Sequence, residues 1–241
     1  NYVALATKDN RSPVVIKISC NKQLILDEYK ALKHFNGVGC IGVEDINFEH
    51  NALLLEQAVP GDSLKAAENI SSQEKINAYS TVVKTLSERS QANRGDYPHI
   101  CDWLQTIDKT SSEKIPSYLI ATAIKIKNTL LSTVANEVVL HGDLHLDNII
   151  LNNKKWIAID PKGIIGELAF EPFVFDFVSS SDQNEIKTAA IALAESLNID
   201  VDRLLQWTFV RAVLSACWFV EDNGNPGEAI AMAESVCLLI K

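Results

Sequence analysis

Long apolar runs are absent from this sequence of 241 residues, and none approaches the ~18 residues of a membrane-spanning helix. The first residues also lack the basic and then apolar segments of a secretion signal. The five cysteines are scattered, odd in number and never spaced as CxxC. This pattern favours a reduced, cytoplasmic protein over a disulfide framework or a cysteine-based zinc site.

An excess of basic residues is absent too. The formal net charge of -9 argues against nucleic acid as a partner, because phosphate contacts require a surface rich in lysine and arginine. The acidity is uneven: residues 1–57 hold six Lys/Arg and seven Asp/Glu, whereas the remainder holds sixteen and twenty-four. The acidic remainder is compatible with attraction of a cationic substrate, and also with an ordinary solvated surface.

The start of the chain predicts the order strand, strand, helix, strand, strand. The extended segments are residues 2–6, 13–19, 39–46 and 52–57, with a helix over 21–35 between the two pairs. Pro60-Gly61 then breaks the pattern. We therefore expect a small β-rich domain at residues 1–57 and a larger helical domain at 58–241.

The larger region is mainly helical in pattern. Ser71 and Glu74 form a capping box. The expected helices cover about residues 72–90, 116–135, 184–197 and 202–222, with a last one opened by Asn225-Pro226. Short apolar pieces interrupt them between 138 and 160. The fold class predicted from this order is α+β.

The stretch with the most chemical information is Leu140-His-Gly-Asp-Leu-His-Leu-Asp-Asn-Ile-Ile-Leu151. Phosphoryl transfer to a hydroxyl requires a carboxylate that accepts the hydroxyl proton and oxygen ligands that fix Mg²⁺ on the nucleotide. Asp143 and Asn148 are five residues apart on a loop that leads into a short strand. Asp160 follows a second short apolar run, and pairing of the two strands would bring Asn148 and Asp160 together as a magnesium site.

These residues resemble the catalytic loop and the downstream metal-binding aspartate of protein kinases. His-Gly-Asp at residues 141–143 is similar to the aminoglycoside phosphotransferase branch of that superfamily, which includes choline and homoserine kinases. The resemblance implies a protein-kinase-like bilobal fold, ATP and Mg²⁺ as cofactors, and Asp143 as the catalytic base. His145 is expected to reach the nucleotide phosphates or a loop carbonyl.

Two other interpretations use the same residues. His141, Asp143 and His145 are compatible with metal-ligand spacing in a hydrolase, although no other histidine lies in a comparable motif. A non-catalytic nucleotide-binding protein could also keep the fold. Such a protein would need none of the charged and amide residues of the proposed site, so their presence together argues against it; they are Lys17, Glu28, Asp143, Asn148 and Asp160.

The kinase interpretation demands a lysine on a strand of the small lobe and a glutamate on the next helix. Lys17 ends the strand-like Val14-Val-Ile-Lys, and Glu28 lies on the helix in line with Leu24, Leu32 and Phe35. An acid inside an apolar helix face needs a partner, which Lys17 would provide. In the resembled superfamily the backbone of the segment between the lobes binds the adenine, and here Glu56 and Ala58 would supply it.

A Gly-rich loop over the phosphates should precede the lysine strand, and residues 1–16 contain none. We expect that a segment preceding Asn1 accounts for this absence.

Three segments resemble the aminoglycoside 6-phosphotransferase (streptomycin) and hydroxyurea-resistance kinase family. They are Trp156-Ile-Ala-Ile-Asp-Pro-Lys-Gly163, Leu54-Leu-Glu56 and residues 204–222. One departure is Phe170-Glu-Pro-Phe173, where the family tends to have an aspartate in an Asp-x-Ala-Asn context.

The resemblance implies a small hydroxylated acceptor, and a streptomycin-like acceptor would be cationic. Carboxylates should then line its site. The expected substrate residues are Glu221, Asp222 and Glu171, with Lys162 near the transferred group or paired with an acid. Other small acceptors such as choline, homoserine or a sugar stay possible, and the sequence does not determine the oligomeric state.

Overall fold

The computed structural model of the chain describes residues 1–89, 95–111 and 113–240. The chain forms two compact units, and each is made of two separate stretches. The first contains residues 1–97 and 138–164, and the second contains 98–137 and 165–241. In the part of the chain that the structure describes, no helix has both the length and the apolar character needed to cross a membrane.

The strands of the first unit are β1 (Tyr2–Thr7), β2 (Pro13–Ile18), β3 (Val43–Asn47), β4 (Ala52–Glu56), β5 (Pro60–Ser63), β6 (Val138–Leu140), β7 (Ile149–Asn152) and β8 (Lys155–Ala158). Its helices are α1 (Lys22–Phe35) and α2 (Ser72–Ser87). Strands β1 to β4 form an antiparallel sheet in the order β1-β2-β4-β3. The predicted order of elements in this sheet is confirmed.

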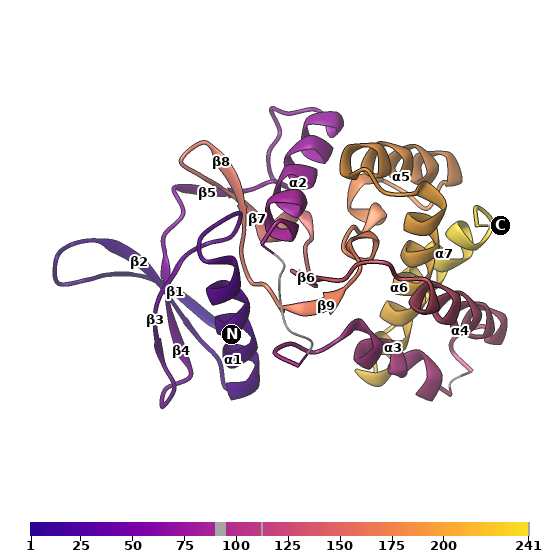
Figure 1. The fold of residues 1–241 in the computed structure, drawn as a ribbon, viewed down its shortest axis with the longest axis horizontal. Helices are drawn as coiled ribbons and strands as arrows, with labels where there is room; N and C mark the ends of the chain where they lie inside the picture. The colour runs from indigo at the N-terminus through magenta and orange to yellow at the C-terminus, as the bar shows by residue number, and fades with distance from the viewer. Residues whose placement is uncertain (90–94, 112, 241) are drawn as a thin grey trace. The chain divides into compact units, whose positions relative to one another are not determined.

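Helix α1 begins and ends where the sequence indicates. The Asn21 side chain accepts hydrogen bonds from the first turn, and Asn36 adopts the left-handed conformation at the C-terminal end. The buried face differs from the expected one, because Leu24 is 47% exposed whereas Ile25 is buried. Helical periodicity alone does not separate the two, because Leu24 lies four positions and Ile25 three positions before Glu28, and both spacings place a side chain on the same helix face. The helix packs against β3 and β4 (Figure 1).

The first unit does not end at residue 57. The region of Pro60-Gly61, expected to be a break between domains, forms β5, which pairs with β7; β7 in turn pairs with β8. Helix α2 packs on β6 and β8. These contacts attach residues 138–164 to the first unit, so the predicted catalytic loop belongs with the predicted lysine strand.

The second unit is helical. Its helices are α3 (Ile100–Lys109), α4 (Ser117–Ser132), α5 (Gln183–Leu197), α6 (Val201–Glu221) and α7 (Gly227–Cys237), and the short strand β9 (Ile164–Gly166) lies where the chain enters the unit. Helix α6 is the centre of its core: it packs against α3, α4, α5 and α7, and Trp207, Phe209 and Val213 on it are fully buried.

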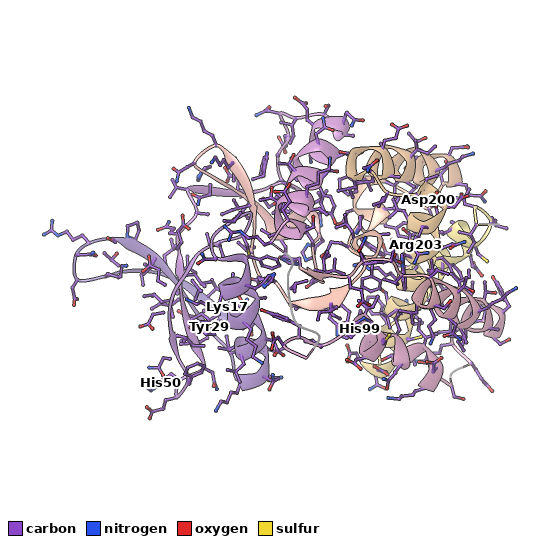
Figure 2. All side chains as sticks on the ribbon, in the orientation of Figure 1. Lys17, Tyr29, His50, His99, Asp200 and Arg203 are labelled. Carbon is purple, nitrogen blue, oxygen red and sulfur yellow. The ribbon has the colours of Figure 1, made fainter. Side chains whose placement is uncertain are left out.

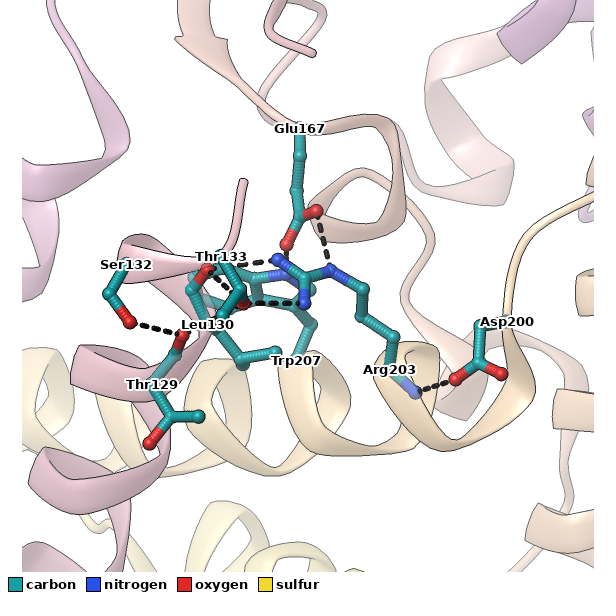
Figure 3. A network of polar contacts seen from close by, with 8 residues as sticks. All are labelled: Thr129, Leu130, Ser132, Thr133, Glu167, Asp200, Arg203 and Trp207. Carbon is teal, nitrogen blue, oxygen red and sulfur yellow. Dashed lines mark hydrogen bonds and ion pairs between the residues drawn. The ribbon is translucent and has the colours of Figure 1, made fainter. Parts of the chain in front are cut away.

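A buried polar network fixes the start of α6 against the end of α4 (Figure 3). The Arg203 guanidinium donates to Glu167 Oε2 at 2.7 Å and to the Leu130 carbonyl oxygen at 2.9 Å, and the Trp207 indole also donates to Glu167. Asp200 caps α6 by accepting from the Arg203 backbone at 2.8 Å. The guanidinium thereby adds a side-chain donor to a carbonyl in the last turn of α4, which also accepts from the Thr133 N–H at 3.1 Å.

Candidate functional site

Lys17 is a buried cation of the first unit (labelled in Figure 2). Strand β2 lies between β1 and β4 in the sheet, and the Lys17 side chain is 4% exposed. Its Nζ lies 2.8 Å from Glu28 Oε2 on α1 and 2.9 Å from Asp160 Oδ2. A buried ion pair is costly unless its geometry is good. The structure thus brings together three residues that the sequence placed on a strand, a helix and a loop.

The two carboxylates determine the charge of Lys17. Burial alone would lower the pKa of the ammonium, but Glu28 and Asp160 outweigh burial, so the pKa of Lys17 is raised above its ordinary value. The side chain is therefore a fixed positive charge at neutral pH. A permanent cation next to an aspartate is the arrangement that neutralises phosphate oxygens in phosphoryl transfer.

The loop after β6 is held by a buried histidine. His141 is fully buried, and its Nε2 donates to the Ile159 carbonyl oxygen at 2.7 Å. The Asp143 backbone N–H donates to His141 Nδ1 at 3.2 Å, and the Asn148 side-chain amide donates to the Asp143 carbonyl oxygen at 2.9 Å. Backbone contacts thus fix Asp143 while its carboxylate stays 45% exposed, as a group that must reach a substrate requires.

Asn148 precedes β7 and Asp160 follows β8, at the same end of the two paired strands. Strands β7 and β8 are antiparallel, and the Ile159 N–H donates to the Asn148 carbonyl oxygen at 2.9 Å. Because the Asn148 amide nitrogen is engaged by Asp143, the side-chain oxygen remains as an acceptor. Asp160 adopts a left-handed conformation with φ of 60°. An amide oxygen and a carboxylate suit Mg²⁺, which usually takes one or two protein ligands and completes its shell with phosphates and water.

Neutral His141 makes the stability of the fold depend on pH. Burial lowers its pKa to about 4 from the ordinary 6.5. As pH falls from about 6.5 to 4, the unfolded chain binds a proton that the native ring does not. The stability conferred by the neutral ring is therefore complete above pH 6.5 and falls by about 3 kcal/mol in this window.

Urea unfolding of the wild-type protein and of a His141→Gln variant between pH 7 and 4 checks this expectation. The variant lacks the titrating ring, so the difference in unfolding free energy between the two proteins should shrink as pH falls. Proton NMR of the His141 ring in the wild-type protein gives an independent value. A ring that titrates near pH 6.5, or parallel stability curves, would contradict the assignment.

The hydrolase interpretation does not match these contacts. Both ring nitrogens of His141 are engaged by the backbone, so neither offers a lone pair to a metal. His145 is 40% exposed, and its Nδ1 lies 3.9 Å from Asp147 Oδ2. Among the residues that the structure describes, no group of three His, Cys, Asp or Glu side chains is arranged to hold a metal ion.

The segment after β4 is held by Asn152 of β7. The Asn152 side-chain amide donates to Glu56 Oε1 at 2.9 Å, and its oxygen accepts from the Val59 N–H at 3.2 Å. The Glu56 N–H donates to the Gly42 carbonyl oxygen at 2.9 Å. Ala58 is 9% exposed. The segment predicted to bind adenine is thus an ordered part of the first unit, and its contact with adenine stays a prediction.

The acids predicted to contact the acceptor lie in the second unit and differ in exposure. Glu221 and Asp222 are exposed at the C-terminal end of α6. Glu171 is 3% exposed, and its carbonyl oxygen accepts from the Arg211 guanidinium at 2.6 Å. The burial of Glu171 leaves Glu221 and Asp222 as the accessible carboxylates of this set. Lys162 lies in the first unit, and its Nζ is 3.4 Å from Asp143 Oδ2.

Sequence reasoning missed two residues that brace the catalytic loop. Tyr79 of α2 is fully buried and donates its hydroxyl proton to the Leu144 carbonyl oxygen at 3.1 Å. Lys65 Nζ lies 2.9 Å from Asp147 Oδ2. Helical periodicity indicates that Tyr79 faces the core, but no local signal identifies a partner 65 residues away.

Comparison with known proteins gives a family and a fold. A family model described as aminoglycoside/hydroxyurea antibiotic resistance kinase matches residues 2–223. The streptomycin 3''-kinase of Klebsiella pneumoniae is 25% identical over 233 residues, which cover 91% of this chain and 84% of that protein. The streptomycin 6-kinase of Streptomyces glaucescens is 25% identical over 227 residues, covering 87% and 71%.

Among solved structures, the choline kinase LicA from Streptococcus pneumoniae superposes with a TM-score of 0.71 at 14% identity, covering 97% of this chain and 89% of that one. The shared architecture agrees with the α+β class predicted from the sequence, a β-sheet followed by a mainly helical part.

Proposed function

We propose that the protein transfers the γ-phosphoryl group of ATP to a small cationic acceptor of the aminocyclitol type. The chain belongs to the aminoglycoside/hydroxyurea antibiotic resistance kinase family. It is therefore a phosphotransferase that acts on hydroxyl groups. The observation that carries this proposal is the set of ion pairs in the first unit. Lys17 contacts both Glu28 and Asp160 at under 3 Å, and Asp143 presents an exposed carboxylate from a rigid loop.

Five residues of the first unit have a role in this mechanism. Lys17 binds the phosphates of ATP, and Glu28 keeps it in place. Asp143 orients the acceptor hydroxyl and takes its proton as the oxygen attacks the γ-phosphorus. Asn148 and Asp160 would hold Mg²⁺, which neutralises charge on the phosphate oxygens when it is bound. Positioning and charge stabilisation then supply most of the acceleration.

Two observations support a cationic acceptor. The residues after 57 carry the excess of negative charge. Glu221 and Asp222 lie at the C-terminal end of the 21-residue helix α6, where the helix dipole adds to their negative potential. Two relatives that are 25% identical are streptomycin kinases named for different positions of their acceptor. The position phosphorylated here is not part of the proposal.

The acceptor is identified by measuring ADP release from ATP with streptomycin, other aminocyclitols, neutral polyols, choline, homoserine and hydroxyurea. We expect turnover with the cationic aminocyclitols and none with neutral polyols. If neutral polyols are phosphorylated equally well, the proposed acceptor class is wrong, while the assignment as a phosphotransferase stands. If no acceptor in the panel is phosphorylated, the acceptor belongs to another chemical class.

Removal of the two exposed acids should weaken acceptor binding. In a Glu221→Gln/Asp222→Asn variant we expect the acceptor KM to rise roughly three- to tenfold, because an exposed ion pair contributes modestly. The ATP KM should stay unchanged, and the effect should shrink at high ionic strength. A matched variant, Glu195→Gln/Asp202→Asn, removes the same charge at exposed positions of the second unit. Equal KM changes in both variants would rule out a specific role for the pair.

A further inference from the structure

The turn at Asp160-Pro-Lys-Gly163 is built so that one lysine projects from it. Asp160 and Gly163 both have positive φ, at 60° and 66°, and Pro161 between them has a fixed φ. A Cβ on Gly163 would lie 2.8 Å from the Ala31 Cβ, so only glycine fits. Pro161 and Gly163 are buried, whereas Lys162 is exposed.

The backbone of this turn is tied to the loop that carries Asp143. The N–H groups of Lys162 and Gly163 both donate to the His141 carbonyl oxygen, at 2.8 and 3.3 Å. Asp143 follows His141 by two residues on the same loop. The distance between the start of the Lys162 side chain and the predicted base is therefore set by rigid backbone contacts.

The ion pair between Lys162 and Asp143 does not account for this construction. Nζ and Oδ2 are 3.4 Å apart, and each side chain is 45% exposed. An exposed pair with this separation adds little to stability. Its exposure leaves the ammonium free to contact a second anion that approaches Asp143.

A second anion is expected at this place during the proposed reaction. Lys17, which the proposed mechanism assigns to the phosphates, is already shared by Glu28 and Asp160. The carboxylate of Asp143 and the γ-phosphoryl group are both negative, so their approach is opposed by repulsion unless a cation lies between them. Transition states of phosphoryl transfer carry charge on the equatorial oxygens, which a positioned cation stabilises.

We propose that Lys162 is a further catalytic residue, whose ammonium contacts the γ-phosphoryl oxygens while the group passes to the acceptor. This inference rests on the proposed function. In the step, the acceptor oxygen forms a bond to the γ-phosphorus, and the bond from that phosphorus to the β–γ bridging oxygen breaks. ADP leaves with the bridging oxygen, and the acceptor proton passes to Asp143. Lys162 keeps its proton throughout.

The test compares ATP with ADP in a Lys162→Met variant, in the presence of Mg²⁺ and without any acceptor. Because the ammonium contacts the γ-phosphoryl group, we expect ATP affinity to fall about ten- to a hundredfold and ADP affinity to stay within about twofold of wild type. Lys155→Met is the matched control, since Lys155 is an exposed lysine of the same unit at the start of β8. It should change neither affinity.

A Lys162→Arg variant keeps the charge and should retain the preference for ATP over ADP. Equal losses of ATP and ADP affinity, or no loss of either, would overturn the proposal, because the contact would then not involve the γ-phosphoryl group. This readout needs no acceptor, so it stays decisive if wild-type protein phosphorylates nothing in the panel. That result would count against the proposed function and not against the contact.

Discussion

Replacement of Asp143 by asparagine is expected to lower the turnover number by about 10²–10⁴-fold, the usual contribution of a positioned general base. ATP affinity should stay close to that of wild type. The reason lies in the contacts of Asp143: its N–H and its carbonyl oxygen hold the loop through His141 and Asn148. The substitution leaves these backbone bonds intact and removes only the carboxylate charge.

The measurement is steady-state turnover with an acceptor identified in the panel, together with ATP titration of the same preparation. Asp45→Asn is a matched control, because it makes the same chemical change at an exposed aspartate of β3 in the same unit, outside the catalytic loop. It should keep near-normal turnover. An Asp143→Asn variant that keeps wild-type turnover, on an acceptor that the wild-type protein phosphorylates, would show that Asp143 is not the base.

The Lys17–Glu28 pair was predictable because each residue carries a local signal. Lys17 follows a run of β-branched residues that predicts a strand. Glu28 interrupts an apolar helix face, where a charged residue requires a partner. The choice between Leu24 and Ile25 on that face was not predictable, since both are apolar and one helical position apart. The predicted pairing of Glu28 with Lys17 was nevertheless correct, because Glu28 does lie on the buried face of α1.

The division into two units could not be read from the sequence. It depends on pairing between β5 and β7, whose paired residues Pro60 and Asn152 lie far apart in the chain. Local patterns carry no information about such pairing. The Pro-Gly break at this point is a true local signal, but it marks a short strand rather than a boundary.

Helix α3 was missed for a different reason. Its N-cap is His99, whose ring Nδ1 accepts from the Cys101 N–H at 3.0 Å, while Asp102 accepts from the His99 N–H at 3.1 Å. This is a capping box in which histidine replaces the usual serine or threonine. A search for the common N-cap residues therefore passes over this helix.

Replacement of Asp160 by alanine is the sharpest test of the proposed magnesium site. In wild-type protein, Mg²⁺ should increase ATP affinity. In the variant we expect this increase to be lost, a change of about 10- to 100-fold that corresponds to one charged contact of about 1.5–3 kcal/mol. Turnover should fall by orders of magnitude. ATP titrations with Mg²⁺ and with a chelator, on both proteins, measure the effect directly.

The control must separate the loss of a metal ligand from the loss of a partner for Lys17. Asp160 contacts Lys17 at 2.9 Å, so its removal also changes that lysine. Glu28→Gln removes the other carboxylate of Lys17, at 2.8 Å, and should weaken ATP binding while the increase caused by Mg²⁺ persists. If Mg²⁺ still increases the ATP affinity of the Asp160→Ala variant, or if this increase is lost equally in both variants, the metal is held by other ligands. Loss in Asp160→Ala alone is the result that the oxygen donors at the ends of β7 and β8 predict.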